Sequence, residues 1–243
     1  MQKLLIIAGC TAVGKSDFAI KLSEQLNMEI ISADSVQVYK GIEIATSKPT
    51  AQEKELCKHH LVNFVNPFEN YNAYNFVCDA KRAIETIAKQ NKLPVIVGGT
   101  GLYIDSLLYG FDFAGAKNSP NFDFKYIFLN DNRDTIYSKI NLRVDKMLEK
   151  GLIDEVKALR NIGITIDCQC MQAIGYKEIW SYLDGEMSLQ DSISLMKKNT
   201  RNYAKRQLTW FRQEQDAEEW LVANNLKLID YLTKYFYEYK KSA

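Results

Sequence analysis

The sequence predicts an α/β protein with a parallel five-stranded sheet flanked by helices, followed by a helical C-terminal part. Two observations support this fold class. Short apolar runs alternate with helical patterns over residues 1–130, as in parallel sheets whose strands are joined by helices. Residues 131–243 show helical patterns without further apolar runs of this kind. We therefore expect one domain over 1–243, with its α/β core in 1–130 and a mainly helical part in 131–243.

Each of the five expected strands is a short apolar run that ends in polar or turn-forming residues. These runs are Leu4–Ala8, Glu29–Ala33, Leu61–Val65, Pro94–Val97 and Tyr126–Leu129. Apolar residues at helical spacing predict helices after Gly14 and near 73–91 and 102–109, and Thr50 is placed to cap a short helix. In the C-terminal part we expect helices near 133–149, 152–160, 171–183, 188–212 and 226–239.

A glycine-rich turn joins the first expected strand to the first expected helix. It has the pattern G-x-x-x-x-G-K-[ST] of the P-loop and consists of Gly9, Cys10, Thr11, Ala12, Val13, Gly14, Lys15 and Ser16. In this motif, backbone N–H groups and the helix N-terminus bind phosphate oxygens, the lysine adds positive charge and the serine hydroxyl ligates Mg²⁺. Because strand, turn and helix follow in the required order, we expect a P-loop NTPase-like sheet that binds a phosphate chain.

Two further expected strands end in residues that the fold should bring close to the P-loop. The second strand leads into Asp34, and the fourth leads into Gly98, Gly99 and Thr100. Ligands of open parallel sheets bind beyond the carboxyl ends of the strands, so Asp34 and Thr100 are expected at one site. An Asp often ends an apolar strand in P-loop ATPases to hold Mg²⁺, but the fourth strand lacks one. Asp34 is the better candidate carboxylate, as a base, a Mg²⁺ partner or a helix cap.

The densest basic segment lies in the long helix expected over 188–212. Six cations occur within sixteen residues that contain no acidic residue, and aromatic residues are interspersed: Lys197, Lys198, Arg201, Lys205, Arg206 and Arg212, with Tyr203, Trp210 and Phe211. Such a segment suits contacts with nucleic-acid phosphates, although a solvated helix surface has the same composition.

Composition narrows the classes of protein further. The chain has 243 residues and a formal net charge of +1, so a nucleic-acid site must be a local patch. Five scattered cysteines do not form a secreted disulfide framework, which favours the reducing cytoplasm. No N-terminal leader is recognisable, and no apolar run approaches the roughly 18 residues of a membrane span. Cys57, His59 and His60 lack a second cluster at zinc spacing, so we expect no structural metal there.

Several motifs together resemble the bacterial tRNA dimethylallyltransferases, also called tRNA isopentenyltransferases. They follow in order over about 1–110 and 125–212: Ile31–Tyr39, Thr46–Thr50, His59–Leu61, Val97–Tyr103, Arg143–Leu148, Met171–Glu178 and Thr200–Arg212. Because many independent motifs agree, the resemblance is specific.

The resemblance implies transfer of a dimethylallyl group from dimethylallyl diphosphate to N6 of adenosine 37, in tRNAs that read codons beginning with U, with release of pyrophosphate. It implies that residues Gly9–Ser16, together with Arg143, bind the diphosphate of this donor. The catalytic residues that it implies are Asp34, Thr11 and Thr100. Asp34 would take the proton from the amine, while the P-loop and a Mg²⁺ ion on Ser16 would stabilise the departing pyrophosphate.

The resemblance also implies a partner, the anticodon stem-loop of tRNA, whose target base must be extruded into a channel. The residues that it places at the RNA are Asp34, Ser35, Val36, Gln37 and Thr100 around the base, and Arg201, Lys205 and Arg206 along the backbone. It implies Mg²⁺ as the cofactor, and we expect a monomer in the cytoplasm without a membrane segment.

The chain departs from the family pattern between the fourth and the fifth expected strand. Family members carry a helical insertion there, followed by an Arg-rich segment, and both are missing near 111–124. The insertion grips the anticodon stem-loop in the family, so its absence leaves two alternatives open: an adenylate isopentenyltransferase that modifies free AMP, ADP or ATP, and a P-loop small-molecule kinase. The short length favours the former, whereas residues 200–212 favour tRNA. A kinase would need an Arg-rich lid, which 111–124 do not provide.

Overall fold

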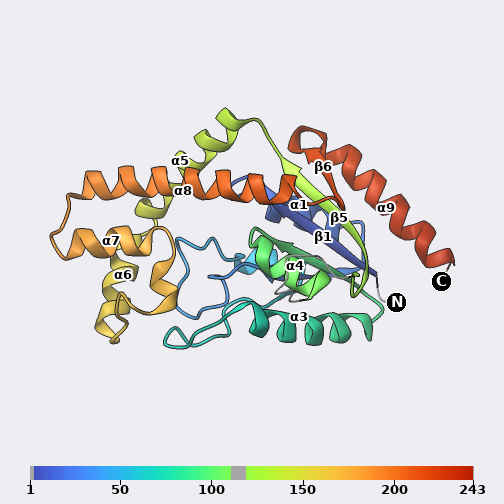
Figure 1. Ribbon diagram of the computed structural model, residues 1–243, viewed down its shortest axis with the longest axis horizontal. Coiled ribbons are helices and arrows are strands. Elements are labelled where there is room, and N and C mark those ends of the chain that lie inside the picture. The colour runs from blue at the N-terminus through green and yellow to red at the C-terminus, as the bar shows by residue number, and fades with distance from the viewer. Residues whose placement is uncertain (1–2, 111–118, 243) are drawn as a thin grey trace.

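The computed structural model describes residues 3–110 and 119–242. Its centre is one sheet with the strand order β3-β2-β4-β1-β5-β6, in which all strand pairings are parallel (Figure 1). The strands are β1 Lys3–Gly9, β2 Met28–Ala33, β3 His59–His60, β4 Leu93–Gly98, β5 Asp123–Asn130 and β6 Ala217–Leu221. The predicted α/β class with a parallel sheet is therefore confirmed.

Two details of the predicted sheet are wrong. The sheet has six strands rather than five, because β6 adds a parallel edge strand beside β5. No apolar run marks β6, since Glu218 and Glu219 at its centre are exposed. The third strand is displaced: it covers His59–His60, whereas Leu61 and Asn63 have φ values of 60° that no strand accommodates.

The predicted helices are all present, most within small shifts of their ends, but the one expected over 171–183 begins only at Tyr176, after a separate 3₁₀ turn over Gln169–Gln172 and Gly175 with φ 108°. They are α1 Lys15–Ser23, α2 Ala51–Leu56, α3 Ala73–Ala88, α4 Gly101–Tyr109, α5 Arg133–Glu149, α6 Leu152–Asn161, α7 Tyr176–Leu183, α8 Leu189–Arg212 and α9 Asn225–Ser242. Thr50 caps α2 in a capping box, and the Asn132 side chain caps α5 by accepting from Thr135 N at 2.8 Å. In the part of the chain described, none of these helices is long and apolar enough to cross a membrane.

Two apolar cores cover the two faces of the sheet. Successive residues of β1 contribute to the two cores in turn, because successive side chains of a strand point to opposite faces. Leu4 and Ile6 pack in the core that includes α3 and α4, whereas Leu5 and Ile7 pack in the core that includes α1 and α9. In Figure 1, α3 and α4 accordingly lie on one side of the sheet and α9 on the other.

The helices α5 to α8 extend beyond the carboxyl ends of the strands (Figure 1). The longest of them, α8, returns across this edge and contributes to both cores, with Ala204 in one and Phe211 in the other. It also packs on α5 and α7. The helical C-terminal part therefore encloses the edge at which ligands of parallel sheets bind.

The register of the sheet brings the predicted site residues to one level. Ala8 of β1 and Ala33 of β2 both pair with Gly98 of β4, so these three strands end together. A Cβ atom on Gly98 would lie 2.2 Å from the carbonyl oxygen of Ala33, which explains why this crowded position is a glycine. As a result, the P-loop, Asp34 and the turn before Thr100 start side by side.

His59 and His60 make structural contacts at the edge of the sheet. His60 Nε2 lies 2.6 Å from the buried carboxylate of Glu29 on β2, and Lys92 Nζ donates to the same carboxylate at 2.6 Å. Burial alone would raise the pKa of Glu29, but the hydrogen bonds from Lys92 and His60 hold this pKa below its ordinary value. His59 Nδ1 lies 2.7 Å from the carbonyl oxygen of Cys57. The contact of His60 with Glu29 fastens the short strand β3 to β2.

The shortened junction expected near 111–124 lies in large part outside the described residues, because 111–118 are not described. Where the described chain resumes, Asn121 N donates to Leu108 O at 2.7 Å, and Asn121 Nδ2 donates to Leu107 O at 3.3 Å. The chain is therefore back at the end of α4 by residue 121, before it enters β5.

Candidate active site

The P-loop curves around the amine of its own lysine. Lys15 Nζ donates to the carbonyl oxygens of Gly9 at 2.9 Å and Cys10 at 2.8 Å. Ala12 with φ 64° and Gly14 with φ 104° provide the left-handed backbone that this tight turn requires. The helix α1 starts at Lys15, so its free N–H groups face the loop. The loop has the backbone shape of an anion cradle.

The pKa of Lys15 is lowered to about 8, mainly because burial disfavours the charged amine. The Cys10 thiol and the Asp34 carboxylate oppose this shift, and the positive charge of Arg143 adds to it. An anion in the loop would restore the charged form, since opposite charges stabilise each other. Lys15 is therefore prepared to pair with a phosphate oxygen.

Asp34 follows β2, and the two oxygens of its carboxylate differ in their contacts. Its Oδ1 accepts hydrogen bonds from Val36 N at 2.9 Å and Gln37 N at 3.2 Å, as in an N-cap. Its Oδ2 accepts no hydrogen bond from the described residues. One oxygen thus fixes the side chain, and the other is available to a ligand.

Thr100 and Tyr203 lie beside Asp34. Ser35 N donates to Thr100 Oγ1 at 3.3 Å, which ties the segment after β2 to the turn after β4. Burial and then the charge of Asp34 raise the pKa of Tyr203 to about 12, while hydrogen bonds to Thr100 and Gln207 lower it in part. The Tyr203 phenol is therefore neutral at physiological pH and can act as a hydrogen-bond donor.

Arg143 reaches the P-loop from α5. Its Nη1 donates to Thr11 Oγ1 at 3.2 Å. Burial lowers the pKa of Arg143, and the nearby carboxylate of Asp34 counteracts this effect. The structure thus brings Thr11, Lys15, Asp34 and Arg143 together, as the sequence and the family resemblance predict.

Two cavities meet at these residues. The larger, of about 630 Å³, is lined by the P-loop residues Thr11, Gly14, Lys15 and Ser16, by Gln37 and by the segment 43–50. The smaller, of about 380 Å³, is lined by Ser35, Val36, Met147, Gln172, Met196 and Arg206. Thr11, Asp34, Thr46, Arg143 and Tyr203 line both cavities. The free carboxylate oxygen of Asp34 therefore belongs to the wall between a phosphate-binding space and a second, more apolar space.

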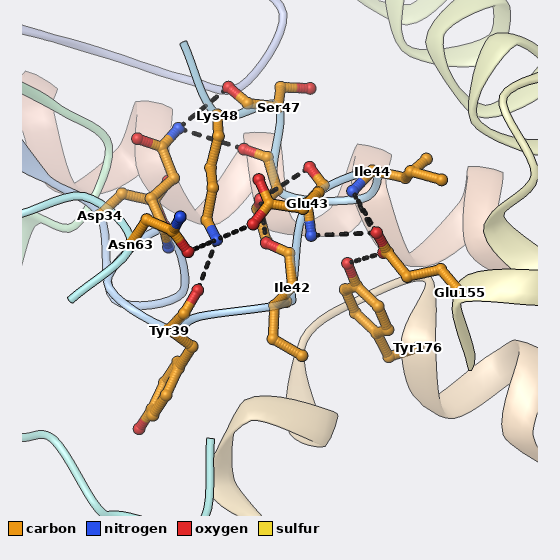
Figure 2. Close-up of polar contacts among 12 residues, drawn as sticks. Asp34, Tyr39, Ile42, Glu43, Ile44, Ser47, Lys48, Asn63, Glu155 and Tyr176 are labelled. Carbon is orange, nitrogen blue, oxygen red and sulfur yellow. Dashed lines mark hydrogen bonds and ion pairs between the residues drawn. The ribbon is translucent and has the colours of Figure 1, made fainter. Parts of the chain in front are cut away.

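The wall segment 42–48 is held in place by polar contacts of Lys48 and Glu155 (Figure 2). Lys48 Nζ, almost fully buried, donates to Tyr39 O, to Glu43 Oε1 at 2.9 Å and to Asn63 Oδ1 at 3.0 Å. From the opposite side, Glu155 of α6 accepts from Ile44 N at 3.1 Å. These contacts give the larger cavity a preorganised side.

Gln37 contributes to this wall instead of accompanying Ser35 and Val36. Its Nε2 donates to Thr46 O at 3.1 Å and to Ser47 O at 3.2 Å, and its Oε1 accepts from Ser32 Oγ at 2.9 Å. The amide is fully engaged, and Gln37 lines the larger cavity while Ser35 and Val36 line the smaller one. The sequence alone does not show that Gln37 faces a different cavity from its neighbours Ser35 and Val36.

Gln207 is a site residue that the sequence analysis missed. From α8, its Oε1 accepts from Thr11 N at 2.9 Å and its Nε2 donates to Gly99 O at 2.8 Å. The residue is 6% exposed, so its amide is largely shielded from water. A signal exists in the sequence, because this polar residue falls between Ala204 and Phe211 in the apolar series of α8. Gln207 joins the P-loop to the end of β4.

Replacing Gln207 by glutamate is expected to lower the catalytic efficiency for the phosphate-bearing substrate by about tenfold or more at neutral pH. The carboxylate still accepts from Thr11 N, but it opposes the Gly99 carbonyl, which loses its donor. Because a protonated carboxyl regains this donor, the defect should shrink as the pH falls. The check is kcat/KM against pH for Gln207→Glu and for Gln190→Glu, an exposed position on the same helix. A defect that does not change with pH would mean that Gln207 only stabilises the fold.

The basic residues of α8 separate into two groups. Lys197 pairs with Asp145 at 2.6 Å, and Arg201 Nη1 donates to Asn141 Oδ1 at 2.7 Å, so both hold α8 against α5. Lys205 and Arg206 are exposed, and Arg206 lines the smaller cavity with its guanidinium 5.7 Å from the Tyr203 ring centre. Lys198 and Arg212 are exposed as well, so the cations of α8 that are available to a polyanion are spread along the helix, and Arg206 is the one that lines the smaller cavity.

A P-loop at the edge of a parallel sheet, beside a carboxylate that two cavities share, defines a P-loop enzyme. Within that class, a family model for IPP transferase matches residues 37–121 and 114–214, and the chain belongs to this family.

Individual proteins agree with this assignment. The tRNA dimethylallyltransferase of Alkaliphilus oremlandii is 36% identical over 289 residues, with 92% of each chain covered. The crystal structure of the full-length tRNA isopentenylpyrophosphate transferase from Bacillus halodurans is similar with a TM-score of 0.91 and 33% identity, over 99% of both chains. A eukaryotic dimethylallyltransferase, crystallised acting on tRNA, is similar with a TM-score of 0.80 and 28% identity, over 91% of this chain and 74% of that chain.

The comparisons bear on the alternatives and on the length. The three proteins are transferases named for tRNA, which supports neither a kinase nor an enzyme of free adenine nucleotides. The alignment with the Alkaliphilus protein spans 289 residues, more than the 243 of this chain. That relative therefore contains residues without a counterpart here.

Proposed function

We propose that this protein transfers a dimethylallyl group from dimethylallyl diphosphate to N6 of adenosine 37 in tRNAs that read codons beginning with U, releasing pyrophosphate. The observation that carries the proposal is the position of Asp34, whose free carboxylate oxygen lies on the wall shared by the two cavities. Donor and acceptor can then approach this oxygen from opposite sides. The relatives that are tRNA dimethylallyltransferases support the same assignment.

The larger cavity is the proposed donor site. The N–H groups of the P-loop and of the α1 N-terminus would bind the diphosphate, with Lys15 and Arg143 as its cationic partners. Negative charge grows on the diphosphate as its bond to C1 of the dimethylallyl group breaks. Preorganised donors and cations stabilise that charge at the moment it forms, which lowers the barrier.

One residue of the proposed donor site, Ser16, is suited to bind Mg²⁺. The Ser16 hydroxyl is exposed, lines the larger cavity and makes no hydrogen bond within the described residues. Oxygen ligands and phosphate oxygens are what Mg²⁺ prefers, so Ser16 would hold the ion beside the diphosphate. When bound, Mg²⁺ would neutralise part of the pyrophosphate charge.

The smaller cavity is the proposed site of the target base. Its walls include Ser35 and Val36 together with apolar side chains from α5 and α8, such as Met147 and Met196. Such a lining suits an extruded adenine, whose faces are apolar. As the N6–C1 bond forms, the N6 proton passes to the free oxygen of Asp34 and pyrophosphate leaves on the opposite side. Thr100 and Tyr203 position this region through their contacts with Ser35 N and with each other.

RNA contacts are proposed on α8 for Arg206, which lines the smaller cavity, for the exposed Lys205 next to it in sequence, and for Arg201, whose guanidinium also bonds to Asn141. We assign 1–243 to one domain that lacks the family's helical insertion near 111–124. The family model matches in two pieces that overlap over 114–121, and the chain is back at α4 by Asn121, which supports that position. The tRNA substrate implies action in the cytoplasm, and we propose that the protein acts as a monomer.

The deciding experiment offers labelled dimethylallyl diphosphate and Mg²⁺ to four acceptors in parallel. These are an unmodified tRNA with A36-A37-A38, its isolated anticodon stem-loop, AMP and ATP. We expect label in the tRNA or in the stem-loop, and none in AMP or ATP. Label in the stem-loop would show that the core suffices without the insertion. Label in AMP or ATP would reassign the protein to free nucleotides. Hydrolysis of ATP without prenyl transfer would overturn the proposal.

A further inference from the structure

A row of four cations lies along one face of α5. Lys139, Arg143, Lys146 and Lys150 are spaced by four, three and four residues, so they follow one another along the helix surface. They line a hollow of about 190 Å³ that also includes Ile44 and Ser47 of the wall segment. Arg143 and Lys150 line the larger cavity as well. The hollow is therefore continuous in its lining with the P-loop cavity.

The four cations of this row differ in their contacts. Lys139 pairs with Asp131 at 3.0 Å, and Arg143 donates to Thr11. Lys146 and Lys150 are exposed and pair with no acidic residue of the described chain. Lys146 is in the last turn of α5 and Lys150 follows it, where the helix dipole favours cations. The dipole accounts for the sign of these charges but not for their place on the face that borders the cavity.

We propose that Lys146 and Lys150 form an outer phosphate-binding surface, which captures the diphosphate before it enters the P-loop and guides pyrophosphate out. The inference rests on the proposed function, because that function supplies the diphosphate. Unpaired cations beside a cavity raise the local concentration of an anion and accelerate its capture, most strongly at low ionic strength. Arg143 continues the row inward, so an anion can move from Lys150 past Arg143 to Lys15 without leaving positive charge.

The test compares the Lys146→Gln/Lys150→Gln variant with the wild type. Binding of inorganic pyrophosphate is measured by calorimetry, and its association rate by stopped flow, from low to high salt. We expect association about three- to tenfold slower at low salt, with the difference disappearing at high salt. The matched control is Lys81→Gln/Lys89→Gln, on α3 and at its C-cap, which removes the same charge from a helix far from α5 (Figure 1).

A second arm measures binding of the anticodon stem-loop to the same three proteins. A defect confined to pyrophosphate supports the proposal. A defect in stem-loop binding, alone or equal to the pyrophosphate defect, would make this a surface for RNA phosphates and overturn the assignment. Equal defects in the α3 control, or no defect at all, would reduce the row to general surface charge. Since pyrophosphate binding is measured without catalysis, the outcome stands apart from the transfer assay.

Discussion

Replacing Asp34 by asparagine is expected to lower the rate of prenyl transfer by about 10²- to 10⁴-fold, the usual contribution of a general base. Asparagine keeps the oxygen that accepts from Val36 N and Gln37 N, so the local turn should persist. It cannot take the proton from the attacking amine. Asp34→Ala should be at least as inactive, since it also removes the turn-forming oxygen.

The measurement is a single-turnover rate with saturating donor and stem-loop, together with pyrophosphate affinity and thermal stability. Pyrophosphate affinity should change little, because the P-loop itself is unaltered. Asp154→Asn on α6 serves as the control, because this side chain is 81% exposed and lines neither cavity. Unchanged turnover in Asp34→Asn would remove Asp34 as the base and leave it as a cap.

Replacing Lys15 by alanine is expected to reduce transfer by about 10²- to 10³-fold, the effect of removing one preorganised donor from a developing anion. Affinity for pyrophosphate should fall as well, because Lys15 lies inside the loop that binds it. The exposed Lys21 of the same helix provides the control variant, Lys21→Ala.

The pKa of Lys15 adds a signature that a merely structural lysine would lack. In the free protein this pKa is about 8, so the amine loses its charge as the pH rises through that value. Pyrophosphate affinity of the wild type should therefore decline above about pH 8, while Lys15→Ala should show only the dependence of the ligand itself. Identical pH profiles for the two proteins would contradict the assigned role.

Much of the site was predictable because its motifs are local. The P-loop is specified within eight residues, since the strand, the left-handed turn at Gly14 and the helix N-terminus together make the anion cradle. Asp34 and Thr100 were predictable one step further, because the carboxyl ends of parallel strands share an edge. The register at Gly98 realises that expectation.

Other features depended on neighbours that no local pattern reveals. The strand β6 is half-exposed and acidic, so only its pairing with β5 identifies it. Gln37 is adjacent to Val36 in sequence, yet its amide holds the wall of the other cavity. The cations of α8 are alike in sequence, but contacts with α5 commit Lys197 and Arg201 to packing and leave Lys205 and Arg206 exposed.

The sequence by itself determined the α/β class, the phosphate cradle and the carboxylate beside it, because each depends on backbone geometry within a few residues. Only the tertiary structure decided that Gln207 bonds to Thr11, 196 residues earlier, and that Asp34 lies between two cavities. Such contacts follow from how α8 and the wall segment pack across the sheet edge. That packing is set by the combined burial of many distant side chains, which no short stretch of the chain encodes.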